Sequence, residues 1–428
     1  MNYSLKSAAI LLVLLTSIQC CFGQQTLEIW RGATIHVGDG KTVIPNGYVQ
    51  IYKGKIVGLG ACDTLKVPND AKVRDFNGKQ IYPALIACNT NIGLQEIELA
   101  RPTRDEQEVG ELNPNVRSLI AYNTDSKIGP TLRTNGVLMV QTVPDGGLVC
   151  GQSSVFKLDA WNWEDAAYRA DDGLHIHWPS MELPRLPEGS SEDPNKVWTE
   201  ALRTLTQLFE DAKVYGKNPN PVNLKLAAMQ KVLSREQKVY IHLHTAKEIL
   251  AAFEFIAKYN LDAVLVDAEE AYLLANQIAA KKIPVIIGTT HNLPARNDED
   301  IQQPYKTPAQ LYRAGVLVAI QHKNWSGNQR NLPFAAGTAA AYGLLPEEAL
   351  QCITLNAATV LGIADKTGSI TLGKDANLIV SEGDVLDMKS SIIRYACLNG
   401  NTVNLRNGQT ELYEKYLKHY EELGVPKH

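Results

Sequence analysis

The chain has 428 residues, of which 45% are hydrophobic and 21% are charged, and its formal net charge is −4. This length and composition are typical of a globular protein with one large domain and one smaller domain. The charged residues form no basic stripe, which argues against nucleic acid as a partner.

The first 23 residues have the pattern of a secretory signal peptide. A short apolar run follows Lys6, and small residues lead to Gly23. The apolar run is shorter than a membrane-spanning helix. We therefore expect cleavage after Gly23 and export to the periplasm or the extracellular space, without a membrane span. The alternatives are an uncleaved anchor and a lipid anchor at Cys20 or Cys21, although Gln19 is a poor residue before a lipidated cysteine.

The cysteines that remain after this cleavage are widely spaced and include no Cys-x-x-Cys pair. Such spacing predicts no disulfide framework. We expect most of these side chains to be buried thiols. They are Cys62, Cys88, Cys150, Cys352 and Cys397.

Residues 24–82 alternate apolar and polar side chains, with glycines and Asn46-Gly47 at the predicted turns. This pattern predicts antiparallel strands joined by hairpins. Residues 364–406 return to the same pattern, so we expect the two segments to form one composite β-sandwich domain. Residues 407–428 include the charged amphipathic run ELYEKYLKHYEELG, which predicts a C-terminal helical tail suited to packing or pairing.

Between residues 83 and 363, short apolar runs alternate with amphipathic runs of helix length. Strands that are buried on both faces are apolar throughout, so these runs predict a parallel sheet. Their number and total length favour an α/β fold with a (β/α)8 TIM-like barrel. A doubly wound open sheet is the alternative, but no Gly-x-Gly-x-x-Gly motif follows any of the runs. Five of the predicted strands are 136–144, 238–244, 262–268, 283–290 and 315–322.

Polar side chains stand at the ends of the predicted strands, where the catalytic residues of a barrel lie. A structural explanation exists for each: an aspartate before a helix usually caps it, and asparagines after a strand usually form a turn. Two histidines at alternate positions of a strand share one face. In chain order the strand ends carry Asn89 and Asn91, His242 and His244, Asp267, His291, and His322 with Lys323.

Several stretches of the chain resemble the metal-dependent amidohydrolase superfamily in its imidazolonepropionase-like branch. GLLPEEALQCITLNAATVLGI, followed by GSITLGKDANLIVSEGD, closely resembles the last barrel helix of the family and the return into its sandwich. GYVQIYKGKIVGLG resembles the opening sandwich strands, and AGVLVAIQ resembles the approach to the eighth barrel strand. The resemblance covers nearly the whole mature chain and implies a barrel inserted between the two halves of a composite sandwich.

The resemblance also implies a zinc-dependent hydrolase of C–N bonds. The family carries His-x-His at the end of the first strand, a lysine or glutamate on the fourth in binuclear members, a histidine at the ends of the fifth and sixth, and an aspartate on the eighth. The metal lowers the pKa of a bound water toward about 7 and polarises the substrate carbonyl. The eighth-strand aspartate acts as the proton shuttle.

This chain departs from the family pattern at most of these positions. In PALIACNTNIG, Asn89 and Asn91 stand where the two first-strand histidines are expected. Asp267 takes the place of the sixth-strand histidine. Lys323, or His322 if the register slips by one residue, takes the place of the eighth-strand aspartate. Several simultaneous replacements would remove the mechanism rather than retune it.

Only the fifth strand keeps a histidine, His242, with His244 beside it. Amide oxygens such as those of asparagine suit Ca²⁺ better than Zn²⁺, so we expect no metal cofactor. The ammonium of Lys323 could replace the charge of the metal and pair with Asp267. A weak oxygen and nitrogen site remains an alternative, with Asn89, Asn91, His242 and Asp267 as its ligands.

These observations predict a degenerate, metal-free family member that acts as a non-catalytic partner or ligand-binding subunit. Its ligand would be small and amide- or peptide-like. We expect Lys323, His322 and Asp267 at the former catalytic positions. We expect the ligand to be held by His242, His244, His291 and Arg296, whose loop follows the seventh strand and whose guanidinium could hold a carboxylate.

An active hydrolase of cyclic amides or dipeptides is the alternative function. Its acid–base groups would come from His242, His244, His322 and Asp267. Cys88 makes a poor nucleophile, because strand alternation points it away from the face that carries Asn89. Assembly as a homodimer, or as a heterodimer with an active paralogue, is expected for either function.

Overall fold

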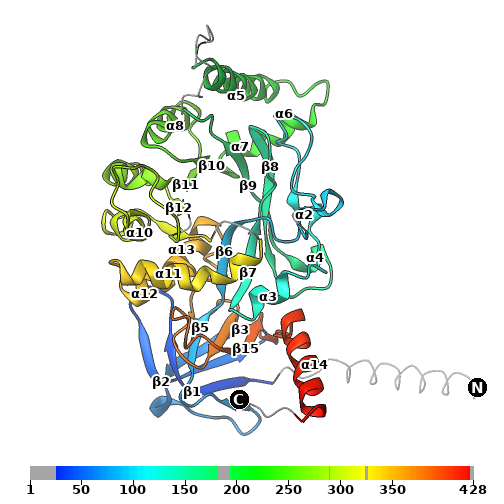
Figure 1. Ribbon diagram of the computed structural model, residues 1–428, viewed down its shortest axis with the longest axis vertical. Coiled ribbons are helices and arrows are strands. Elements are labelled where there is room, and N and C mark those ends of the chain that lie inside the picture. Colours follow the sequence, from blue (N-terminus) through cyan, green and yellow to red (C-terminus); the bar gives the residue numbers. More distant parts are fainter. Residues whose placement is uncertain are drawn as a thin grey trace, which may run out of the picture.

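The computed structural model describes residues 26–424 except 98, 182–192, 194, 289 and 323–325. Two sheets of eight strands each organise this part of the chain (Figure 1). The predicted signal peptide and Lys323 lie outside the described residues. Among the helices of the described residues, none is both long and apolar enough to cross a membrane.

The smaller sheet joins strands from both ends of the chain. Its strand order is β16-β15-β14-β5-β1-β2-β3, and β4 pairs with β1. Its buried core centres on Trp30, which lies edge-on to Phe76 and Tyr395. The strands are β1 Glu28–His36, β2 Val43–Tyr52, β3 Lys55–Ala61, β4 Lys72–Asp75, β5 Gln80–Pro83, β14 Leu378–Ser381, β15 Ile393–Leu398 and β16 Asn401–Thr402. The antiparallel pairing of β5 with β14 confirms the composite sheet that the sequence predicts.

The larger sheet is a nearly closed barrel in the order β13-β12-β11-β10-β9-β8-β7-β6. Its two outermost strands, β6 and β13, come together where Asn89 Nδ2 donates a hydrogen bond to Gln321 Oε1 at 2.8 Å. The barrel therefore confirms the predicted fold class over the doubly wound alternative. The strands are β6 Leu85–Thr90, β7 Val137–Thr142, β8 Val149–Lys157, β9 Ala167–His177, β10 Lys238–Leu243, β11 Ala263–Asp267, β12 Val285–Ile287 and β13 Val318–Ile320.

One barrel strand runs against the other seven. β8 pairs antiparallel with both β7 and β9, so the predicted strand–helix repeat is broken here. No helix lies between β7 and β8, and only the four-residue helix α4 (Trp163–Ala166) lies between β8 and β9. The sequence pattern did not identify β8 because polar side chains occupy buried positions of this strand, among them Gln152, Ser153 and Ser154.

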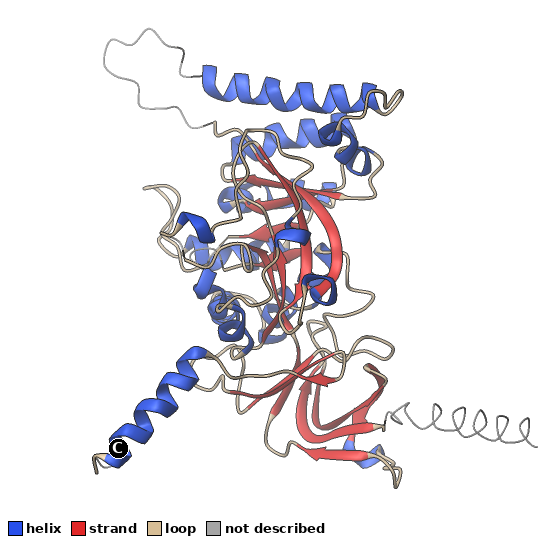
Figure 2. Ribbon diagram, turned by 90° about the vertical axis from the view of Figure 1, so that its right-hand side faces the viewer, coloured by secondary structure: helices blue, strands red, loops and turns tan. Residues whose placement is uncertain are grey.

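Helices cover the outside of the barrel (Figures 1 and 2). In α8, Thr245 and Glu248 form a capping box at the start, and Asn260 ends the helix in the left-handed conformation. The α-helices are α2 Ser118–Ala121, α3 Gly129–Arg133, α4 Trp163–Ala166, α5 Lys196–Tyr215, α6 Leu224–Ala228, α7 Gln230–Leu233, α8 Ala246–Tyr259, α9 Ala275–Lys281, α10 Gln303–Arg313, α11 Leu332–Ala341, α12 Pro346–Cys352, α13 Leu355–Val360 and α14 Gly408–Glu422. The 3-10 helices are η1 Cys62–Thr64, η2 Arg101–Thr103, η3 Glu269–Leu274 and η4 Ser326–Asn331.

The resemblance of GLLPEEALQCITLNAATVLGI to one last barrel helix of the family is inexact in one respect. The segment forms two helices, α12 and α13, which are interrupted at Ile353 and Thr354. The carbonyl of Ile353 accepts a hydrogen bond from the backbone of Ile86 in β6, at 3.0 Å. A tertiary contact with the barrel thus replaces one helical hydrogen bond at the break.

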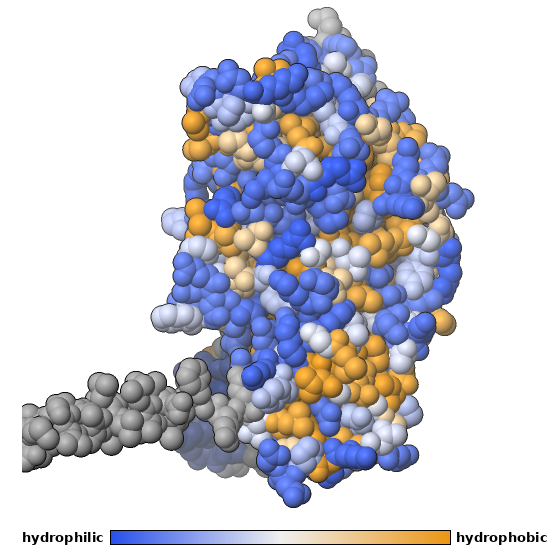
Figure 3. Space-filling view, turned by 180° about the vertical axis from the view of Figure 1, so that it is seen from behind, coloured by the Kyte–Doolittle hydropathy of each residue, from blue (hydrophilic) through white to orange (hydrophobic). Residues whose placement is uncertain are grey.

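The predicted helical tail is α14, which projects from the body of the molecule (Figure 2). Asn407 caps its start by accepting a hydrogen bond from the backbone of Thr410. None of its residues is buried, and Tyr413, Tyr416 and Tyr420 are exposed. Seen from behind, the barrel surface mixes polar and apolar side chains, and a broader apolar area lies toward the smaller sheet (Figure 3).

Candidate functional site

A cavity of about 670 Å³ opens at the carboxyl ends of the parallel barrel strands. It brings together five of the positions predicted from the strand ends, namely Asn89, Asn91, His242, His244 and Asp267. The remaining lining residues are Thr90, Val143, Pro144, Asp145, His177, Trp178, Ser180, Glu248 and Gln329. The cavity lies where the active sites of barrel enzymes are found.

Direct hydrogen bonds connect the strand-end side chains across the barrel. Asn89 donates to Gln321, and Gln321 Nε2 in turn donates to Asp267 Oδ1 at 2.8 Å. The other carboxylate oxygen, Asp267 Oδ2, lies 3.5 Å from His242 Nδ1. Asn89 and Asp267 both adopt positive φ angles, +52° and +69°, which turn the chain sharply at the two strand ends.

The second ring nitrogen of His242 extends this series of hydrogen bonds into the barrel interior. His242 Nε2 lies 2.9 Å from His175 Nδ1, and His175 Nε2 lies 2.9 Å from Ser153 Oγ. Ser153 Oγ donates to Asp172 Oδ1 at 2.7 Å, so its oxygen accepts from His175 Nε2. This order makes His175 Nδ1 an acceptor and His242 Nε2–H the donor. A proton on His242 Nδ1 would therefore create an imidazolium that faces Asp267.

Asp172 is the last residue of this hydrogen-bond series, and it is fully buried inside the barrel. Its other carboxylate oxygen accepts hydrogen bonds from Gln141 Nε2 and the Tyr240 hydroxyl, both at 2.8 Å. Burial raises the pKa of Asp172, and the hydrogen bonds from Ser153, Tyr240 and Gln141 oppose this shift only in part. The pKa of Tyr240 is raised as well, by burial and by the neighbouring Asp172. We call the connected side chains of Asn89, Gln321, Asp267, His242, His175, Ser153 and Asp172 the axial network.

The axial network does not fit the zinc ligand set that the family resemblance implies. The side-chain amides of Asn89 and Asn91 donate to Gln321 and Gln95, and His242 directs its two ring nitrogens to His175 and Asp267. Within the described part of the chain, one group of three or more His, Cys, Asp or Glu side chains brings its ligand atoms within 4.8 Å. That group is Asp145, Cys150 and His177, of which only His177, at the end of the fourth strand β9, stands at a strand end that carries a ligand in the family pattern.

His322 and His291 lie away from the cavity lining. His322 is buried just after β13, where burial and the nearby charge of His291 lower its pKa. His291 Nε2 lies 2.5 Å from Thr338 Oγ1. The structure therefore does not bring these two predicted site residues together with His242.

His244 and Arg296 lie at the outer side of the site, and both line a second cavity of about 760 Å³. His244 Nδ1 lies 2.9 Å from Glu269 Oε2, and this hydrogen bond raises the pKa of His244. Arg296 forms ion pairs with Glu270 at 3.0 Å and with Asp298 at 2.9 Å. A ligand carboxylate would have to compete with two protein carboxylates for this guanidinium.

Two simpler interpretations of the strand-end residues have different outcomes. The expectation that Asp267 caps a helix is wrong, because the N-cap of η3 is Ala268 and the Asp267 carboxylate accepts from Gln321 instead. Cys88 is buried in β6, and burial raises the pKa of its thiol well above the usual range. Such a thiol is a poor nucleophile. Cys150, Cys352 and Cys397 are buried too, as expected for most of the cysteines.

The sequence pattern missed a second His-x-His pair, His175 and His177, at the end of β9. The signal was present, because LHIHW (174–178) repeats the spacing of the IHLHT run that ends β10. β9 pairs in parallel with β10, and His177 lies directly opposite His242. Asp145 gave no comparable signal, since it stands in a loop after β7.

Comparisons with known proteins agree with this architecture. The model of the amidohydrolase family matches residues 153–406. An imidazolonepropionase of Streptococcus pyogenes serotype M12 (strain MGAS2096) is 23% identical over 379 residues, which cover 81% of this chain and 86% of that protein.

Solved structures show the same fold. An amidohydrolase from Thermotoga maritima MSB8 superposes with a TM-score of 0.76 and 26% identity, over 89% of this chain and all of that one. A prolidase complexed with N-methylphosphonate-L-proline superposes with a TM-score of 0.55 and 15% identity, over the same shares of the two chains. Since the family model covers more than half of the 428 residues, the chain belongs to the amidohydrolase family, in its imidazolonepropionase-like branch.

Proposed function

We propose that this chain is a non-catalytic member of the amidohydrolase family that binds a small amide- or peptide-like ligand, without a metal at the barrel centre. The observation that carries this proposal is the axial network. Asn89, Gln321, Asp267 and His242 bond to one another across the position where a metal and its water would lie. A central ion would have to break several of these buried contacts, each costly to leave unmade.

The cavity supports the ligand class. Its volume of about 670 Å³ is in the range of small-molecule sites. Trp178, Val143 and Pro144 offer apolar surface, while Asn91 and His244 offer polar groups nearby. Side-chain amides pair well with a peptide bond because each amide carries both a donor and an acceptor. The prolidase neighbour, which holds a proline-containing phosphonate, points to dipeptides as the first compounds to test.

Metal analysis tests the first half of the proposal. We expect that zinc loading and dialysis of the mature protein leave the same metal content in the wild type as in His242→Ala and Asp267→Asn. Zinc that is bound by the wild type and lost in both variants would place a metal at the barrel centre and contradict the proposal.

Ligand binding tests the second half. Glycyl-proline and dihydrouracil, a dipeptide and a cyclic amide, should each be titrated into the mature protein by calorimetry. We expect binding of at least one of them to weaken more than about tenfold in Asn91→Ala, since removal of a buried hydrogen-bond partner costs about 1.5 kcal/mol or more. Gln302→Ala, on the surface before α10, is the matched control. Binding that is unchanged in Asn91→Ala would remove this cavity as the ligand site.

An active hydrolase with a remodelled site is the second candidate. The observation that favours it is the pair of His242 and Asp267, which lie 3.5 Å apart and both line the cavity. An imidazole and a carboxylate this close can share a proton and act together as an acid–base pair. Hydrolysis of either test compound that disappears in His242→Ala would replace the non-catalytic proposal with this one.

Partner and location remain part of the proposal. A second copy or an active paralogue would cover the exposed tyrosines of the projecting helix α14 (Figure 2) and the apolar area near the smaller sheet (Figure 3). Light scattering after sizing chromatography should give the mass of a dimer, and a single monomeric peak would contradict it. The pattern of residues 1–23 supports export, which cell fractionation and N-terminal sequencing would test.

A further inference from the structure

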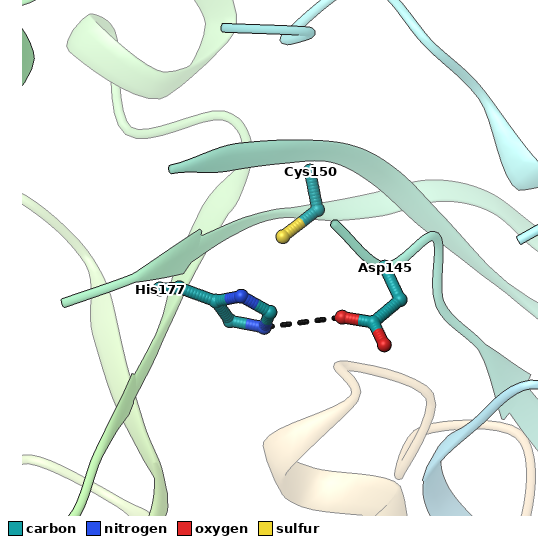
Figure 4. A group of neighbouring side chains, drawn as sticks. All are labelled: Asp145, Cys150 and His177. Carbon is teal, nitrogen blue, oxygen red and sulfur yellow. Dashed lines mark ion pairs between the residues drawn. The ribbon is translucent and has the colours of Figure 1, made fainter. Parts of the chain in front are cut away.

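Three potential metal ligands meet at the edge of the cavity, outside the axial network. Asp145 follows β7, Cys150 lies in β8, and His177 ends β9; we call these three residues the rim cluster. Their ligand atoms all lie within 4.8 Å of one another, and His177 Nε2 is 3.4 Å from Asp145 Oδ1. Figure 4 shows the thiol, the imidazole and the carboxylate converging from the three elements.

A β-bulge places Cys150 in the cluster. Val149 pairs with Ile176 and Gly151 pairs with His175, so Cys150 is the extra residue between two paired positions. Gly151 has a φ of +136°, which a residue with a side chain rarely adopts. Bulges commonly redirect a side chain next to a functional site. Here the bulge lies beside His177, the neighbour of Ile176 in β9.

The loop that carries Asp145 is fixed by backbone contacts. The Asp145 amide donates to the Glu106 carbonyl at 2.7 Å, and Leu148 donates to the Glu111 carbonyl at 2.8 Å. Between them, Gly147 has a φ of +73°, and a Cβ atom there would lie only 2.8 Å from the Gly110 carbonyl oxygen. The carboxylate therefore comes from a loop of defined conformation, as a ligand in a preformed site requires.

The separation of the imidazole and the carboxylate suits a zinc ion. Zinc bonds to imidazole nitrogen and carboxylate oxygen are about 2.0–2.2 Å long, so two such ligands of a tetrahedral ion lie about 3.4 Å apart. This matches the spacing of His177 Nε2 and Asp145 Oδ1. A thiolate together with an imidazole selects borderline metals such as zinc over Ca²⁺ and Mg²⁺.

We propose that the rim cluster binds one zinc ion through Asp145, Cys150 and His177, with an open coordination position that faces the cavity. Asp145 and His177 line the cavity, whereas Cys150 is buried behind them. Three protein ligands and one open position leave room for a fourth ligand from outside the protein, as at catalytic zinc sites. Water or an anionic group of a cavity ligand takes that position. Zinc binding at this site does not depend on the metal-free barrel centre of the proposed function, although the open position faces the same cavity.

Titration of the mature protein with Co²⁺, as a coloured substitute for zinc, tests the proposal. We expect one Co²⁺ per chain, a thiolate-to-cobalt charge-transfer band in the near ultraviolet, and displacement by Zn²⁺. Cys150→Ser should abolish the band, and His177→Gln should weaken Zn²⁺ binding by more than about tenfold, since even changes behind a ligand cost 10- to 100-fold. Cys352→Ser, another buried thiol, is the matched control and should keep the band.

The outcomes separate this proposal from the previous one. A wild-type protein without the band, or a band that survives in Cys150→Ser, would overturn the rim site. If Cys150→Ser fails to fold by circular dichroism, the affinity of His177→Gln decides. Metal that depends on His242 and Asp267 but not on Cys150 would contradict both proposals, whereas metal that depends on Cys150 alone supports the rim site and leaves the axial network metal-free.

Discussion

Two neighbouring strands of the barrel, β9 and β10, end in the same His-x-His pattern, yet their histidines have different surroundings. The inner residues, His175 and His242, are buried and lie within hydrogen-bond distance of each other. The outer residues diverge: His244 pairs with Glu269, while His177 lies beside Asp145 and the thiol of Cys150. The two inner histidines thus belong to one internal network, whereas only one of the two outer histidines, His177, belongs to a candidate metal site. The neighbours, rather than the pattern, decide the chemistry.

The largest effect on stability is expected at Asp172, which connects the inner histidines His175 and His242 to the barrel interior through Ser153. Asp172→Ala removes the acceptor for Ser153, Gln141 and Tyr240 and leaves these buried donors without it. We expect the free energy of unfolding to fall by about 3 kcal/mol or more. Urea denaturation measures this change, with Asp165→Ala on the surface as control. A loss no larger than that of the control would show that the inner pair does not depend on Asp172.

A smaller effect is expected from the residue that closes the network across β6 and β13. Gln321→Leu keeps the volume but removes the link between Asn89 and Asp267. We expect a loss of about 2 kcal/mol, because two buried polar groups lose a partner. Thermal unfolding of this variant and of surface Gln302→Leu provides the comparison. An equal melting temperature for the two would mean that water replaces Gln321 without cost.

A histidine outside the barrel, His36, extends the comparison through pH. His36 in β1 lies 2.6 Å from Glu347 in α12, and the two side chains link the smaller sheet to the barrel helices. Burial alone would lower the pKa of His36, but the hydrogen bond and charge of Glu347 outweigh it and raise the pKa. The His36–Glu347 pair therefore stabilises the fold fully below the pKa of about 6.5 that His36 has in the unfolded chain. This stabilisation is lost as the pH rises through the higher pKa of His36 in the folded protein.

We expect His36→Gln to remove about 1 kcal/mol at pH values near 6 and much less near pH 9, which flattens the fall in stability over that range. Urea denaturation across the range measures the slope. His419→Gln on the exposed helix α14 should leave the slope as in the wild type. A slope that persists in His36→Gln would assign it to another group.

The smallest effect on stability is expected at Asp145, which lies beside the outer histidine of β9, His177. Asp145 is more than half exposed, so Asp145→Asn should change the stability of the metal-free protein by less than about 0.5 kcal/mol. The same variant should lose most of the stabilisation that added zinc gives the wild type, because only the folded state presents the three ligands together. Melting curves with and without zinc measure both quantities. Equal zinc stabilisation in the two proteins would exclude Asp145 as a ligand.

Much of the fold was predictable because parallel barrel strands are buried on both faces and therefore apolar throughout. This pattern identified β6, β7 and β10–β13, together with the strand-end positions that line the cavity. The apolar pattern could not identify β8 or the part of β9 that contains Asp172. In those strands buried positions carry Ser153 and Asp172, which are tolerated because they hydrogen-bond to each other and to neighbouring side chains.

The candidate site was less predictable for a related reason. The replacements at Asn89 and Asn91 are visible in the sequence. The partner of Asn89, Gln321, is not, since the two residues meet only when the barrel closes. Likewise, Cys150 is indistinguishable in sequence from the buried thiols Cys352 and Cys397. Its proximity to His177 depends on the bulge and on the direction of β8.

The reversed direction of β8 has a consequence for how such barrels acquire new sites. In a fully parallel barrel, the first residues of every strand face the end opposite the cavity, where substitutions affect stability alone. Because β8 runs the other way, its opening residues, Cys150 among them, arrive at the cavity mouth instead. A search for functional residues in relatives with a reversed strand should therefore include the beginning of that strand. Variation there can supply a ligand without disturbing the strand ends that the rest of the family uses.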